Sequence, residues 1–145
     1  MKKRILVVDD EPNIVRLLSL RLGANNFEVL VAYDGYQCVE VAKEELPDMI
    51  LLDIKMPLGG GIKAFETIKS LNSTKNIPVI FITAFPSVEV KKQVMSMGAE
   101  DFVSKPFNSD MLIEKINAIF NNRARKASEK NGNGSDFNQN PRKIL

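Results

Sequence analysis

Short apolar runs alternate along the chain with longer segments in which apolar residues recur at helical spacing. A short, continuous apolar run is typical of a strand buried on both faces, as in a parallel sheet that helices cover on each side. The runs lie at residues 5–8, 29–32, 49–52 and 79–82, with a shorter one at 102–103. We therefore predict five buried strands.

Each predicted strand is followed by a segment with the signature of an amphipathic helix. The first begins at Pro12, a residue tolerated in a first turn, and ends at Gly23. Its inward face is predicted to carry Ile14, Leu17, Leu18 and Leu22. The other helices are predicted over residues 35–45, over about 62–71, from an N-cap at Ser87 to Gly98, and from a cap at Asn108 or Ser109 to a frayed end near Lys126.

The order of these elements predicts the fold class. A strand and a helix alternate five times over about 120 residues, and right-handed crossovers turn this order into a doubly wound α/β fold. We expect a five-stranded parallel sheet, (βα)5, between two helical layers, which is a flavodoxin-like three-layer α/β/α arrangement. Ligands of such sheets bind at the carboxyl ends of the strands.

Charge divides the chain into two regions. Of the 145 residues, 20 are basic and 18 acidic, a net charge of +2. Residues 122–145 hold six basic and two acidic residues, so residues 1–121 carry a net charge of −2. Residues 122–145 are also rich in Asn and poor in apolar residues, which predicts a disordered tail or a truncated linker. We therefore place one domain at residues 1–121, and its acidic balance does not favour direct nucleic-acid binding.

Two absences exclude several kinds of chemistry. The chain has no histidine, which excludes histidine-ligated zinc and Ser-His-Asp triads within it. Cys38 is the only cysteine, so no internal disulfide forms, and its apolar neighbours favour a small buried core residue over a nucleophile. The sequence shows neither a signal peptide nor an apolar run long enough to span a membrane, and we expect a cytoplasmic protein.

Polar residues follow four of the five predicted strands. Asp9 and Asp10 follow the first, Asp53 the third, Thr83 ends the fourth and Lys105 follows the fifth. Each could be a loop residue, and Asp9 or Asp10 could cap the helix that opens at Pro12. Three carboxylates at one edge of a sheet, however, repel one another unless a cation neutralises them. Oxygen ligands without His or Cys favour a hard ion, and Mg²⁺ fits best.

The same residues suit phosphoryl transfer to a carboxylate. Asp53 would act as the nucleophile, as carboxylates do in enzymes that form aspartyl phosphates. The Lys105 ammonium and the Thr83 hydroxyl would then bind phosphoryl oxygens.

These residues resemble the receiver domains of two-component response regulators. The similarity covers about residues 3–121 and is carried by Val7-Val8-Asp9-Asp10-Glu11, Asp53-Ile54-Lys55-Met56-Pro57, Thr83-Ala84, Gly98-Ala99 and Lys105-Pro106-Phe107. The resemblance implies that Asp53 accepts a phosphoryl group from a phosphohistidine of a sensor histidine kinase or phosphotransfer protein. It implies a metal site of Asp10, Asp53 and the backbone carbonyl of Lys55, to which Asp9 contributes mostly through water.

The resemblance also implies how phosphorylation is sensed. Thr83 and Lys105 would respond to the phosphoryl group, and Phe102 would be the aromatic switch residue, although its spacing fits a core aromatic equally well. The Lys105–Pro106 peptide bond would be cis, whereas most X-Pro bonds are trans. A downstream protein or a second copy of the chain would read the surface of the fourth helix, fifth strand and fifth helix. No membrane partner is implied.

Two other functions fit parts of the pattern. A Mg²⁺-dependent phosphatase with an aspartate nucleophile shares the fold, but it has a second acidic residue two positions later, where this chain has Lys55. A constitutive interaction module would keep the fold without phosphorylation. We expect a signalling domain that catalyses only its own phosphorylation and slow dephosphorylation. The run Gly59-Gly60-Gly61 beside Asp53 predicts a mobile loop.

Overall fold

The computed structural model describes residues 1–56, 60–84 and 86–144, with side chains up to Lys130. Pro57 and Gly59, which belong to the motifs quoted above, lie outside the described residues. By its internal contacts the chain divides into two compact units, Met1–Leu112 and Ile113–Leu145.

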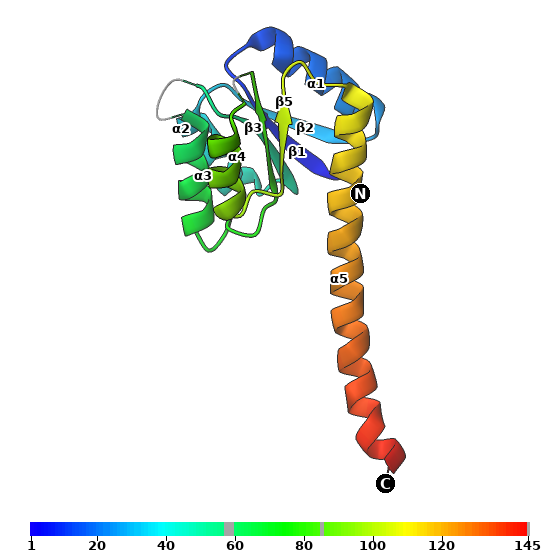
Figure 1. Ribbon diagram of the computed structural model, residues 1–145. Helices are drawn as coiled ribbons and strands as arrows, with labels where there is room; N and C mark the ends of the chain where they lie inside the picture. The colour runs from blue at the N-terminus through cyan, green and yellow to red at the C-terminus, as the bar shows by residue number, and fades with distance from the viewer. Residues whose placement is uncertain (57–59, 85, 145) are drawn as a thin grey trace. The chain divides into compact units, whose positions relative to one another are not determined.

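The strands form one parallel sheet, as predicted (Figure 1). They are β1 (Arg4–Val8), β2 (Glu28–Ala32), β3 (Met49–Asp53), β4 (Val79–Thr83) and β5 (Asp101–Ser104), in the order β2-β1-β3-β4-β5. Every residue of β3 and β4 is buried, which fits central strands covered on both faces. The edge strands β2 and β5 are only partly buried. Strand order reverses between β1 and β3, so this is where a site is expected.

The helices are α1 (Pro12–Ala24), α2 (Gly35–Glu45), α3 (Gly60–Ser70), α4 (Val88–Ser96) and α5 (Ser109–Ile144). Side-chain caps define several of their starts. Asp34 Oδ1 accepts a hydrogen bond from Gln37 N at 2.7 Å, and Ser87 Oγ accepts one from Val90 N at 3.1 Å. Asn108 is the residue that caps α5, because its Oδ1 accepts bonds from two amides of the first turn.

The core between the sheet and α2, α3 and α4 is apolar. Cys38 and Ala42 of α2, Phe65 and Ile68 of α3, and Val94 of α4 belong to one buried cluster with strand residues. Phe65 meets Phe81 of β4 edge to face, with ring centroids 5.0 Å apart. Helix α2 lies beside α3 on this face (Figure 1).

The inward face of α1 differs from the prediction at two positions, Val15 and Leu17. Val15, Leu18 and Leu22 are buried, whereas Leu17 is 40% exposed. These three residues are spaced by three and four positions and so lie on one side of the helix, while Leu17 falls beside that stripe. The prediction that Leu17 faces the core was therefore wrong.

Residues 122–144 continue α5 as helix, past the predicted end near Lys126. Residues 121–130 are exposed, and Ala124 and Ala127 favour helix even without burial. Arg125 and Glu129 add an ion pair at helical spacing, with Nε and Oε1 3.9 Å apart. The structure thus describes helix up to Ile144, and a disordered tail or truncated linker at residues 122–145 stays a prediction. Among the described residues, no helix is both long and apolar enough to cross a bilayer.

Candidate functional site

The carboxyl ends of β1 and β3 bring three aspartates together. Val8 pairs in register with Leu52, so the residues that follow, Asp9 and Asp53, project from neighbouring strands at one edge of the sheet. One carboxylate oxygen each from Asp9, Asp10 and Asp53 lie within 4.8 Å of one another. Asp9 and Asp53 are buried and Asp10 is exposed. The structure therefore assembles the acidic group that the sequence predicted.

Asp9 has hydrogen bonds to both of its carboxylate oxygens. Its Oδ1 accepts a bond from Glu11 N at 3.0 Å, which shapes the turn before α1. Its Oδ2 accepts a bond from Lys105 Nζ at 2.6 Å. Asp9 therefore serves both as a turn residue ahead of α1 and as a member of the acidic group.

Lys105 directly follows the edge strand β5 and extends into this group. Its Nζ lies 3.6 Å from Asp53 Oδ2 and 3.6 Å from Glu11 Oε1, and its side chain is only 9% exposed. The Lys105–Pro106 peptide bond is cis, as the resemblance implies. The contact with Glu11 was not assigned from the sequence, although Glu11 directly follows the two aspartates.

Thr83 and Lys105 are linked through the backbone. Thr83 ends β4 and is buried, one position beyond the register partner of Asp53. Its carbonyl accepts a hydrogen bond from Lys105 N at 2.7 Å. The two residues predicted to sense phosphate therefore lie on connected backbone beside the strand that carries Asp53.

The electrostatics of the group set the protonation of its members. Burial, together with the charges of Asp9 and Asp10, raises the pKa of Asp53 to about 6, against the opposing effect of Lys105 and an Ile54 hydrogen bond. Burial disfavours the charged form of Lys105, but the Asp9 hydrogen bond and the charges of Asp53, Asp9 and Glu11 outweigh it and raise its pKa. Lys105 therefore stays charged and only partly offsets the carboxylates.

The donor set fits a hard divalent cation. All three side chains offer oxygen, and within the described part of the chain they form the only such group of three. Asp10 is the most accessible of them. Lys55 follows β3 in a bend with an exposed side chain, and a role for its carbonyl stays a prediction.

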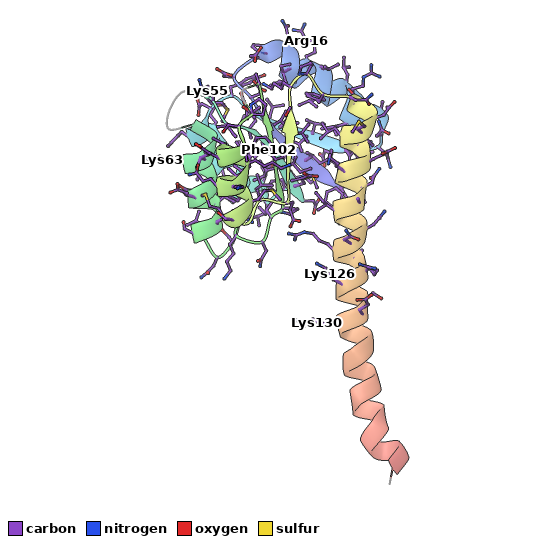
Figure 2. The ribbon with its side chains drawn as sticks, viewed as in Figure 1. Arg16, Lys55, Lys63, Phe102, Lys126 and Lys130 are labelled. Atoms are coloured by element: carbon purple, nitrogen blue, oxygen red, sulfur yellow. The ribbon has the colours of Figure 1, made fainter. Side chains whose placement is uncertain are left out.

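Phe102 lies on the edge strand β5 (Figure 2). It is partly buried and packs against the apolar cluster under α4. This position suits a core aromatic. It also leaves Phe102 partly exposed, as a switch residue would require.

Comparison with known proteins identifies the same family over most of the chain. Residues 5–117 match the family model described as "Response regulator receiver domain". The response regulator PleD of Caulobacter vibrioides (strain NA1000 / CB15N) is 40% identical over 119 residues, which is 82% of this chain and 26% of PleD. The chain thus spans about a quarter of the length of this curated relative.

Solved receiver structures share the fold. A CheY-like response regulator receiver domain protein from Methanospirillum hungatei JF-1 superposes with a TM-score of 0.82 and 27% identity, covering 87% of this chain and 99% of that chain. The signal receiver domain of a Luxo repressor protein from Vibrio parahaemolyticus gives a TM-score of 0.79 and 26% identity, covering 88% and 96%.

Proposed function

Because the chain belongs to the response regulator receiver domain family, we propose that Asp53 is its phosphoacceptor and that a phosphohistidine of a sensor histidine kinase or phosphotransfer protein is the donor. The observation that carries this proposal is the position of Asp53, buried at the strand-order reversal between two further carboxylates and the Lys105 ammonium. The histidine must come from a partner, since this chain has none.

The transfer requires an ionised Asp53. With a pKa of about 6, the carboxylate is mostly charged at neutral pH. One of its oxygens attacks phosphorus, the P–N bond of the donor breaks, and the electron pair of that bond stays on the imidazole nitrogen. Mg²⁺ held by Asp9, Asp10, Asp53 and the Lys55 carbonyl would supply positive charge against the phosphoryl oxygens.

Lys105 and Thr83 would then respond to the new charge. A phosphoryl group on Asp53 adds negative charge within reach of Lys105, which is already 3.6 Å from Asp53 Oδ2. We propose that Lys105 shifts from Asp9 toward a phosphoryl oxygen and that Thr83 donates its hydroxyl to another. Movement of Thr83 would change the packing of Phe102, and so the surface of α4, β5 and the first turn of α5 that a partner protein or second copy binds.

Phosphorylation from a small donor tests the proposal directly. The protein is incubated with phosphoramidate and Mg²⁺, and the intact mass is measured. We expect a gain of one phosphoryl group that Asp53→Asn abolishes and that EDTA suppresses. Asp110→Asn, which changes an exposed carboxylate of α5, should gain the same mass as the unaltered chain.

Two outcomes contradict the proposal: no mass gain in the unaltered chain, or an equal gain in Asp53→Asn. The same protein is also incubated with a phosphomonoester such as p-nitrophenyl phosphate. A receiver should release no more than about one equivalent of product, whereas sustained turnover would indicate the phosphatase alternative.

A further inference from the structure

The backbone that carries Asp53 is in unusually close contact with the first turn of α3. Gly61 is buried, and its N–H donates a hydrogen bond to the Ile54 carbonyl at 2.8 Å. A Cβ added to Gly61 would lie 2.0 Å from the Asp53 carbonyl oxygen and 2.9 Å from the Asp53 carbonyl carbon. Both are backbone atoms, so no side-chain rotation relieves the clash.

The neighbouring glycine makes a second approach to the same segment. Gly60 has a φ of +72°, a conformation that L side chains rarely adopt. A Cβ at this position would lie 3.2 Å from the Ile54 carbonyl oxygen. Two consecutive glycines therefore contact two consecutive carbonyls, those of Asp53 and Ile54.

We propose that Gly60 and Gly61 are positioning residues for phosphorylation, because they let α3 pack against the Asp53–Ile54 backbone and so fix the carboxylate of Asp53 among its partners. The proposal rests on the proposed function of Asp53. A Cβ contact below 3.0 Å is essentially never seen, so a side chain at Gly61 must separate the two backbones by about 1 Å. A displacement of that size at a reacting group can cost a factor of about 10² in rate.

The geometry also gives two glycines of the run a packing role that the sequence did not predict. The sequence predicts mobility for Gly59-Gly60-Gly61, with Gly59 outside the described residues. Gly60 and Gly61 begin α3; Gly61 occupies a place that excludes a side chain, and Gly60 has a backbone conformation that strains one. A substitution at Gly60 would therefore combine strain at a positive φ with any change in mobility.

The test compares glycine-to-alanine variants of the whole chain by the rate of mass gain from phosphoramidate with Mg²⁺. Gly61→Ala should be slower by about 10- to 100-fold, and Gly60→Ala by a smaller factor, because its contact needs a shift of only tenths of an ångström. The initial rate is measured across donor concentrations. A displaced nucleophile lowers the maximal rate and leaves the donor concentration at half-maximal rate little changed.

Two other glycines of the chain serve as matched controls. Gly23→Ala introduces a methyl group that meets nothing within 4 Å, and Gly98→Ala introduces the same strain of a positive φ, +104°, before the amino end of β5. Both should keep the rate of the unaltered chain. Gly98→Ala is the more important control. A rate lost through reduced stability of the fold would be lost in Gly98→Ala as well, whereas a rate lost through displacement of Asp53 would not.

Each outcome decides the question. The proposal is overturned if Gly61→Ala keeps its rate within about threefold, or if Gly98→Ala slows the reaction as much. If Gly61→Ala does not fold, the rate of Gly60→Ala is compared with that of Gly98→Ala, and equal rates overturn the proposal. Failure of the proposed function is a separate result, since the unaltered chain would then gain no mass at all.

Discussion

Lys105 Nζ lies 2.6 Å from Asp9 Oδ2 but 3.6 Å from Asp53 Oδ2, so the ammonium is hydrogen-bonded to the carboxylate that is not the proposed acceptor. The pair is well buried, with side chains 9% and 3% exposed. Removing one member of a buried ion pair is costly, because the charge that remains is neither paired nor solvated. Without a bound cation, Lys105 is thus the positive charge that lets Asp9 and Asp53 lie together.

This pair predicts that Lys105→Met destabilises the metal-free protein. We expect the free energy of unfolding in EDTA to fall by about 2–4 kcal/mol, since the buried Asp9 carboxylate loses the ammonium that is hydrogen-bonded to it. Mg²⁺ should restore more stability to the variant than to the unaltered chain, because it replaces the missing charge. Urea unfolding followed by circular dichroism with EDTA or Mg²⁺ measures both effects.

Lys43→Met is the matched control for Lys105→Met. Lys43 pairs with Glu40 at 3.6 Å, but both side chains are exposed, at 49% and 40%. Loss of an exposed pair should cost less than about 1 kcal/mol, with no dependence on Mg²⁺. Equal losses in the two variants would show that the buried pair has no special role.

The raised pKa of Asp53 predicts a stability that falls as pH rises. The ordinary value is 3.8 and the folded value about 6, so the folded state binds the proton more tightly. The contribution of Asp53 to stability is therefore fully present below pH 3.8 and is lost as pH rises through about 6. Asp53→Asn removes this loss and should stabilise the metal-free protein by about 1–3 kcal/mol above pH 6.

The pH dependence itself is the check on this interpretation. The gain in melting temperature of Asp53→Asn should shrink as pH falls toward 3.8 and should also shrink in Mg²⁺, which neutralises the carboxylate in the unaltered chain. A gain that is the same at all pH values would mean that the amide stabilises the fold for another reason.

Cys38 should be chemically inert in the folded protein. Its side chain is fully buried, and burial together with the charge of Asp34 raises the pKa of its thiol to about 12. Only the thiolate reacts with disulfide reagents, so we expect labelling by a soluble aromatic disulfide in mild alkali to be undetectable until guanidinium unfolds the chain. Intact mass gives the result, and fast labelling of the folded protein would contradict the burial.

The hydrophobic pattern predicted the five strands and their helices, because burial follows local periodicity. It also predicted the edge where Asp9, Asp53 and Lys105 meet, because parallel strands place their carboxyl ends at one edge of a sheet. The misassigned Leu17 lies next to buried Leu18, and a leucine-rich helix does not itself mark which stripe faces the core. The helical course of residues 122–144 was missed because composition measures the burial a segment can gain, while alanines and ion pairs also favour helix. The contacts of Gly61 depend on tertiary packing and have no pattern in the sequence beyond the glycines themselves.

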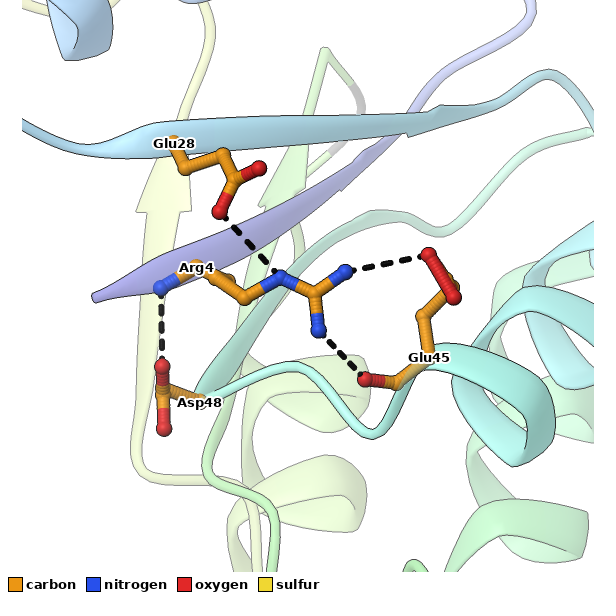
Figure 3. Close-up of polar contacts among 4 residues, drawn as sticks. All are labelled: Arg4, Glu28, Glu45 and Asp48. Atoms are coloured by element: carbon orange, nitrogen blue, oxygen red, sulfur yellow. Dashed lines mark hydrogen bonds and ion pairs between the residues drawn. The ribbon is translucent and has the colours of Figure 1, made fainter. Parts of the chain in front are cut away.

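Arg4 joins three elements at the edge of the sheet opposite the candidate site (Figure 3). Its Nη1 and Nη2 donate to the carbonyl and carboxylate of Glu45 at the end of α2, at 2.8 and 3.0 Å, and its Nε lies 3.3 Å from Glu28 Oε2 on β2. Its backbone N donates to Asp48 Oδ2 at 2.8 Å. A guanidinium can make these side-chain contacts together because its donors are held in a fixed fork.

Arg4→Met should separate this structural network from the chemistry. The variant keeps the apolar stem and the bond to Asp48 but loses the guanidinium, and we expect a loss of about 1–2 kcal/mol in the free energy of unfolding. Arg125→Met, which removes an exposed pair with Glu129, should cost less than about 0.5 kcal/mol. Both should be phosphorylated at the rate of the unaltered chain, because Arg4 lies at the amino end of β1 and Arg125 is an exposed residue paired with Glu129. A slower reaction of folded Arg4→Met would instead show that the two edges of the sheet are coupled through β1, which carries Arg4 at one end and leads into Asp9 at the other.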